Sequence, residues 1–180
     1  MELSELFKTR ASRVQKIIDN LEDGAKGIVE FTSSDLKKSE DELLKIHNLF
    51  PHCSEGVSYL YRIDLVGATK KTCEEARSAF RRFQQCKEFK LSRFNDDHPA
   101  SESVYVGTSQ DMFERFRSHI GVGTGQSTYG LYLAKWAQGV KTSFRVEYSA
   151  FNTIEACDME LIEGVLWDSL KPMFGKKGGK

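Results

Sequence analysis

Apolar residues recur at helical spacing in the N-terminal part of the chain and predict two helices there. The first covers residues 4–22 and stops at Asp23-Gly24. The second starts behind a polar cap at residues 33–35 and ends before Pro51, because proline interrupts a helix. Together they are expected to form an N-terminal helical extension over residues 1–54.

The rest of the chain alternates between strand and helix periods. Strict alternation over residues 57–66 predicts a strand that carries Tyr59 and Tyr61 on one face. A second apolar strand begins at Val104 and turns at Gly107 into an amphipathic helix. Three further elements are a short helix, a third strand and a last helix opened by an Asn-x-x-Glu cap, predicted over residues 129–138, 144–151 and 152–170.

The helix that follows Gly107 carries a cation and a titratable base together. Arg115 and His119 are four residues apart and therefore lie on one face, beside an apolar stripe that can dock on the strands. A planar guanidinium matches two phosphate oxygens at once, and an imidazole can move a proton near neutral pH. The pair therefore suits chemistry on a phosphodiester.

The sequence carries no net charge that would draw it onto nucleic acid. Lysine plus arginine equals aspartate plus glutamate, at 26 each, so any DNA affinity has to come from local patches. One such patch lies in residues 67–102, where eight basic residues between Lys70 and Arg93 outnumber three acidic ones. This segment fits a phosphate clamp and a solvated surface helix equally well. The candidate DNA contacts are the basic residues Arg77, Arg81, Arg82 and Lys135.

The cysteines and the absence of a long apolar run indicate where the protein works. Its four cysteines are scattered without a Cys-x-x-Cys pair, which favours reduced thiols over a disulfide framework or a zinc site. The sequence has no signal peptide pattern and no apolar run of membrane length. We therefore expect a cytoplasmic location and no membrane partner.

Residues 104–119 resemble the second half of the GIY-YIG nuclease signature. In that signature a strand bearing Tyr-Ile-Gly leads into a helix with the catalytic arginine and, in many members, a histidine one turn later. Tyr105, Gly107, Arg115 and His119 stand at the matching positions. The family also has a first strand that ends in Gly-Ile-Tyr, and a later helix whose metal-binding glutamate precedes a Leu-x-Pro ending.

Both of these further elements have counterparts in this chain, so that the resemblance spans residues 56–175. Residues 55–63 resemble the first strand, and Glu163, seven residues before Leu170, resembles the metal-binding glutamate. The resemblance implies an α+β fold with a small three-stranded antiparallel sheet flanked by helices. The chain then divides into the N-terminal extension, a nuclease core over 55–175 with a helical insertion at 67–102, and a basic tail at 176–180.

The resemblance also implies a mechanism, which is hydrolysis of a phosphodiester with one Mg²⁺ or Mn²⁺ ion. Tyr59 would act on the attacking water, with His119 as the alternative base or as the group that helps to ionise the tyrosine. Arg115 would neutralise charge in the transition state, and Glu163 would hold the metal. Tyr105 would bind near the scissile phosphate or support the first tyrosine.

Two departures from the family pattern leave alternatives open. An extra residue separates Gly56 from Tyr59, so Tyr61 is the alternative to Tyr59 as the functional tyrosine. Gly175 stands where the family has an asparagine, and its presence would impair or reorganise catalysis if that asparagine fixes the site.

The function expected from these features is that of a stand-alone DNA endonuclease of the restriction or phage-defence type. Cutting both strands would most simply use a symmetric homodimer with one site per strand. The alternatives are a catalytically impaired nucleic-acid-binding or regulatory protein with the same fold, and a repair nuclease that acts within a larger complex.

Overall fold

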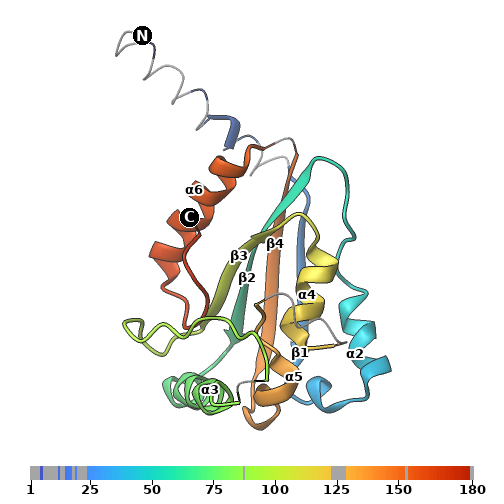
Figure 1. Cartoon of the computed structure of the whole chain (residues 1–180), viewed down its shortest axis with the longest axis vertical. Coiled ribbons are helices and arrows are strands. Elements are labelled where there is room, and N and C mark those ends of the chain that lie inside the picture. The colour runs from blue at the N-terminus through green and yellow to red at the C-terminus, as the bar shows by residue number, and fades with distance from the viewer. Residues whose placement is uncertain are drawn as a thin grey trace.

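A four-stranded antiparallel sheet with the strand order β1-β4-β2-β3 lies at the centre of the computed structural model (Figure 1). The structure describes residues 24–86, 88–122, 129–152 and 154–178, together with 15–17 and the single residues Glu5, Ser12 and Asp19. The strands are β1 (Lys26–Thr32), β2 (Val57–Val66), β3 (Ser103–Ser109) and β4 (Ser143–Asn152). The helices are α2 (Glu40–His47), α3 (Lys70–Phe83), α4 (Met112–Ile120), α5 (Leu133–Trp136) and α6 (Ala156–Leu170), with the 3-10 turns η1 (Asp35–Lys37) and η2 (Ala137–Gly139). The predicted α+β class is confirmed.

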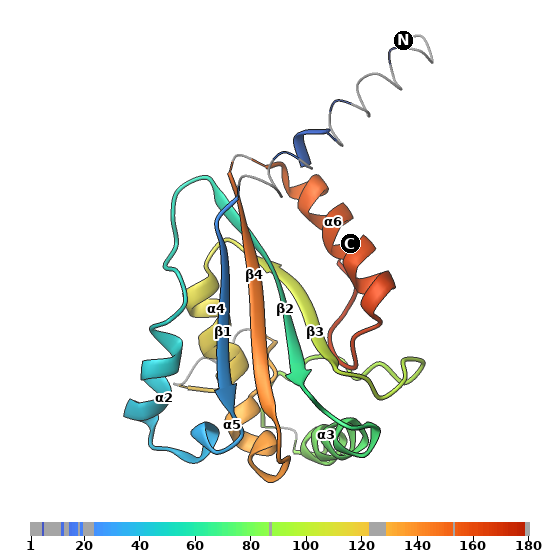
Figure 2. The same ribbon diagram turned by 180° about the vertical axis from the view of Figure 1, so that it is seen from behind.

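Helices cover both faces of the sheet, as the two opposite views show (Figure 2). Helices α2, α4 and α5 lie on one face, whereas α6 lies on the other face against β2 and β3. The larger core, which includes Tyr61 and Phe116, lies between the sheet and the first group of helices. A smaller core holds Leu60 and Met159 under α6. Successive residues of β2 therefore serve the two cores in turn, as strand geometry requires.

The sheet has four strands, and the prediction of three was wrong. Strand β1 lies inside the segment that was expected to be a helical extension, and it pairs with β4. Its Val29 and Phe31 are buried, while Glu30 between them points outward and pairs with Arg145 of β4 at 2.6 Å. The segment alternates as a strand should, but only two apolar side chains mark its inner face, so the pattern was too short to stand out.

The segment after β1 forms two short elements where one helix was predicted. The capping box of α2 joins Ser39 to Glu42, so the predicted cap at residues 33–35 was wrong. Asp35 instead closes the turn after β1, because its carboxylate accepts hydrogen bonds from the backbone N–H and the hydroxyl of Thr32, at 2.8 and 2.7 Å.

The later elements agree with the prediction except at their ends. The strands predicted over 57–66 and 144–151 are confirmed as β2 and β4. Helix α6 begins at Ala156, so the predicted Asn-x-x-Glu cap was wrong, because Asn152 still belongs to β4. The short helix predicted over 129–138 is reduced to α5 and η2.

The insertion between β2 and β3 contains helix α3, which buries Cys73, Ala76 and Phe80. The N-terminal helix predicted over 4–22 lies mostly outside the described residues, and the described residues within it are helical. Within the described part of the chain, no helix has the length and the apolar content that crossing a bilayer requires. The four cysteines are free, with Cys73 buried.

Candidate active site

Two tyrosines lie side by side on the sheet because of the register between β2 and β3. Tyr61 pairs with Gly107 and Ile63 pairs with Tyr105, so Tyr61 and Tyr105 are diagonal neighbours on one face. Their ring centroids are 5.9 Å apart. Gly107 leaves the space between them, since a Cβ there would lie 2.7 Å from Cε1 of Tyr105 and 2.9 Å from the Tyr61 hydroxyl. The glycine of the Tyr-Val-Gly run is therefore required by the tyrosine pair.

Helix α4 aims its cation at both tyrosines. The helix is capped by Asp111, whose side chain accepts the backbone N–H of Glu114 at 3.0 Å. From this helix Arg115 donates from Nε to the Tyr61 hydroxyl at 2.8 Å and from Nη2 to the Tyr105 hydroxyl at 2.7 Å. Its Nη1 donates to the carbonyl of Tyr129 at 2.8 Å. The guanidinium is thus fixed in position by three oxygen acceptors.

His119 lies one turn further along α4 and completes a hydrogen-bonded chain. Its Nε2 is 2.8 Å from the Tyr61 hydroxyl, and the residue is 0% exposed. Because the Tyr61 oxygen already accepts from Arg115, its own hydrogen is available for Nε2 of His119. This donation requires the imidazole proton to be on Nδ1, which has no partner among the described residues, and the direction reverses when the proton is on Nε2.

The charges of the two groups follow from their burial. Burial lowers the pKa of His119 well below its usual 6.5, and the positive Arg115 lowers it further. Burial also raises the pKa of Tyr61 above its usual 10.0, although the charge of Arg115 acts in the opposite direction. In the isolated protein the neutral phenol of Tyr61 therefore faces the neutral imidazole of His119. The two groups become ionised only when an additional nearby charge stabilises their ionised forms.

Glu163 approaches from the other face of the sheet, past the edge strand β3. Thr108 points toward α6, and its hydroxyl donates to Oε2 of Glu163 at 2.8 Å. Burial raises the pKa of Glu163 above its usual 4.5, while the Thr108 hydrogen bond and the charge of Arg115 lower it. Thr108 follows Gly107, the residue that pairs with Tyr61, so the carboxylate and the tyrosine cluster lie on opposite faces of the same part of the edge strand.

The C-terminal tail joins these two sides. Its Phe174 donates a backbone N–H to the carbonyl of Val104 at 3.0 Å. Gly175 follows with a φ of 102°, and a Cβ there would lie 2.8 Å from Cε2 of Tyr105. Gly178 packs on the carboxylate, since its Cβ would lie 2.9 Å from Oε2 of Glu163. The glycine at 175 is therefore a steric requirement of this site, where an asparagine side chain would collide with the ring.

The structure brings together Tyr61, Tyr105, Arg115, His119 and Glu163, but not Tyr59. The Tyr59 ring packs edge-on against Tyr148, with centroids 6.1 Å apart, away from the hydrogen bonds of Arg115. Of the two tyrosines considered from the sequence, Tyr61 is therefore the one that is hydrogen-bonded to Arg115 and His119.

Sequence reasoning missed Thr108. Side chains alternate along β3, so Thr108 points to the face of the sheet that Gly107 and Tyr105 do not occupy, which is the face toward α6. That alternation was a usable signal.

Two of the four predicted DNA contacts also hold the insertion together. Arg77 donates to the carbonyls of Asn95, Asp96 and His98, and Arg81 pairs with the Asp96 carboxylate. Both guanidinium carbons lie over the Phe94 ring, at 4.8 and 4.0 Å from its centroid. The other two, Arg82 and Lys135, are exposed.

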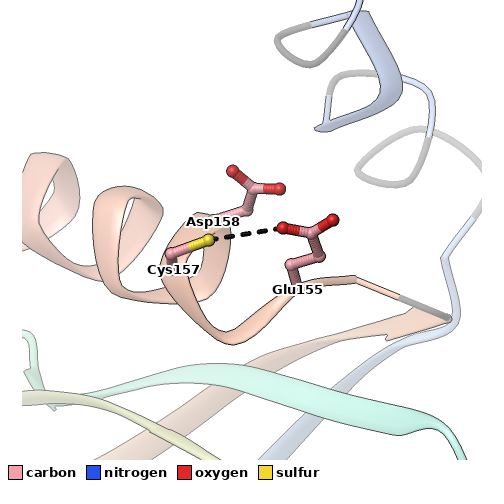
Figure 3. A group of neighbouring side chains, drawn as sticks. All are labelled: Glu155, Cys157 and Asp158. Atoms are coloured by element: carbon pink, nitrogen blue, oxygen red, sulfur yellow. Dashed lines mark hydrogen bonds between the residues drawn. The ribbon is translucent and has the colours of Figure 1, made fainter.

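A second group of potential metal ligands lies at the start of α6. Glu155, Cys157 and Asp158 place their ligand atoms within 4.8 Å of one another, and Figure 3 shows the thiol of Cys157 facing the carboxylate of Glu155 at 3.5 Å. Sulfur favours soft metals and is a poor ligand for Mg²⁺. This group therefore differs in chemistry from Glu163, which offers only oxygen atoms as ligands. The sequence analysis did not identify this group.

Comparison with known proteins finds no match for this chain: no protein-family model, no curated protein and no solved structure matches it. The resemblance to GIY-YIG nucleases accordingly depends on the motif residues themselves, and the function is argued from their geometry.

Proposed function

We propose that the protein is a metal-dependent DNA endonuclease of the GIY-YIG type, with a restriction or phage-defence role. The observation that carries the proposal is the hydrogen-bonded set of Tyr61, Tyr105, Arg115 and His119 on one side of β3, with Glu163 on the other. A fixed cation, a proton acceptor and a carboxylate are the groups that phosphodiester hydrolysis needs.

Glu163 fits a hard divalent ion such as Mg²⁺ or Mn²⁺. One carboxylate, with water and phosphate as the remaining ligands, is a common way to bind Mg²⁺. Burial penalises the ionised form of Glu163, so a nearby cation would favour the carboxylate. When bound, the ion would supply Lewis-acid stabilisation of the leaving oxygen.

The protein's own groups account for the proton and for the developing charge. With the imidazole proton on Nδ1, Nε2 of His119 accepts from the Tyr61 hydroxyl, so a proton that leaves the tyrosine has an acceptor 2.8 Å away. Arg115 would stabilise the resulting tyrosinate, which could orient a water or accept its proton. The same guanidinium would stabilise the negative charge that builds up on the phosphate in the transition state. The Tyr105 hydroxyl accepts from Nη2 of Arg115 at 2.7 Å, which keeps the guanidinium in position for both roles.

A second candidate is a nucleic-acid-binding protein of the same fold without turnover. It is favoured by the closed form of the site, in which Tyr61 is 1% and Glu163 is 7% exposed. Gly178 also packs on the carboxylate, so residues at the end of the chain have to shift before a phosphodiester can reach both sides.

Cleavage of a plasmid and phage DNA panel with Mg²⁺ or Mn²⁺ tests the proposal. Wild type should give discrete fragments, and Arg115→Ala and Glu163→Ala should lose at least about 100-fold in rate. Arg117→Ala and Glu160→Ala are matched controls on the same helices, and they should cut normally. Absence of metal-dependent cutting by the wild type, with DNA binding intact, would support the second candidate instead.

A further inference from the structure

The end of the insertion forms one border of the candidate active site. Residues 90–93 run between the loop after α4 and the C-terminal tail, ahead of β3 (Figure 1). On one side the N–H of Gly130 donates to the carbonyl of Lys90 at 3.1 Å, and the N–H of Ser92 donates to the carbonyl of Gly130 at 2.9 Å. On the other side the N–H of Gly175 donates to the carbonyl of Arg93 at 2.8 Å.

Both neighbours of this segment contact the catalytic cluster directly. The residue before Gly130 is Tyr129, whose carbonyl accepts from Arg115. On the other side Gly175 packs on the ring of Tyr105. The backbone of residues 90–93 is therefore one hydrogen bond removed from segments that touch Arg115 and Tyr105. Its position is set by main-chain bonds, so these residues stay at this border whatever their side chains do.

Three cations lie along this border: Lys90, Arg93 and Lys176, the residue after Gly175. All three are exposed, and within the described part of the chain none of them forms an ion pair. Arg77 and Arg81 differ, since they are held by the carbonyls and the carboxylate of their own loop. Because the whole chain has 26 basic and 26 acidic residues, a local group of free cations is where affinity for a polyanion can arise.

We propose that Lys90, Arg93 and Lys176 form a rim that binds backbone phosphates of DNA next to the scissile bond. This inference rests on the proposed function, because it places the substrate strand over the Tyr61 cluster. Such contacts fix the position of the strand and carry no sequence preference. Lys90 and Arg93 are the insertion's contribution to the rim, and Lys176 is that of the C-terminal tail.

Binding of a labelled DNA duplex, measured without divalent metal over a range of salt concentrations, tests the rim. Each phosphate contact contributes about 0.9 to the slope of log K against log salt, so Lys90→Ala/Arg93→Ala/Lys176→Ala should lower the slope by about 2.7 and the affinity at least tenfold at roughly 0.1 M salt. The matched control Lys70→Ala/Lys71→Ala/Lys141→Ala removes three exposed positive charges that lie outside the rim and outside the candidate DNA contacts. This control should keep the wild-type slope.

The outcomes separate the rim from the proposed function. If the rim variant melts like the wild type and keeps the wild-type slope, or if the wild type binds no DNA, the rim is refuted even when the active site is real. If the control loses as much slope as the rim variant, binding is not localised and the inference also fails. Loss of slope in the rim variant alone, with no cleavage by the wild type, would support the rim and count against the nuclease.

Discussion

Mild acid should destabilise this protein because His119 is buried in its neutral form. The pKa of this imidazole in the folded protein is well below the usual 6.5, whereas the unfolded chain takes up the proton near that value. Below pH 6.5 the unfolded state therefore binds one more proton than the folded state. The free energy of unfolding must then fall as the pH falls, by about 1.4 kcal/mol for each pH unit.

The size of the effect can be worked out group by group. Between pH 6.5 and about pH 5, His119 alone accounts for about 2 kcal/mol. His47 acts in the same direction, because burial lowers its pKa too, although the Phe113 carbonyl opposes this shift. Glu163 acts in the opposite direction, because its raised pKa makes the folded state take up a proton first. Asp35, with a pKa of about 2, contributes only in stronger acid.

Because these contributions overlap, the assay compares variants across pH. Urea unfolding followed by circular dichroism would be measured from about pH 7.5 to pH 5 for wild type, His119→Gln and His47→Gln. Glutamine keeps an acceptor for the Tyr61 hydroxyl and cannot titrate. The His119→Gln variant should lose about 2 kcal/mol less than wild type over the lower part of this range. Parallel curves of stability against pH for wild type and His119→Gln would mean that His119 titrates freely in the folded state. Such curves would refute the conclusion that His119 is a neutral proton acceptor.

Two further substitutions test the tyrosine pair. In a cleavage-rate assay, Tyr61→Phe should lower the rate by about 100-fold, whereas Tyr59→Phe should cut nearly as well as wild type. The reverse order would restore Tyr59 as the functional tyrosine. In chemical denaturation, Gly107→Ala should lower the free energy of unfolding by about 1–3 kcal/mol, because its Cβ would lie 2.7 Å from the Tyr105 ring. The control Gly139→Ala should be near neutral, because a Cβ there would have nothing within 4 Å. Equal effects of the two substitutions would contradict the close packing around Gly107.

The sequence could predict those parts of the site that repeat along one element. Arg115 and His119 share a helix face, and Tyr105 and Gly107 share a strand face, so their spacing was sufficient. The choice between Tyr61 and Tyr59 could not be made in this way, since both point to the same face and only the pairing with Gly107 separates them.

The sequence also could not predict which basic residues face solvent and which pack within the fold. Whether a cation faces solvent or packs over an aromatic ring, as Arg77 does over Phe94, depends on a loop that folds back 18 to 21 residues later. The strand β1 was missed for the same reason. Its short alternation gains meaning only beside β4, which lies more than a hundred residues further along the chain.

The position of β3 at the edge of the sheet explains how residues from both faces can serve one reaction. In the middle of a sheet, Glu163 and Arg115 would be separated by a layer of backbone and could not reach the same phosphate. At the edge, a ligand can contact the Tyr61 side and the Thr108 side together. The tail pairs with β3 near its start, at Ser103 and Val104, and its Gly178 packs on Glu163, so a substrate strand that crosses at Gly107 and Thr108 would first have to displace the end of the tail.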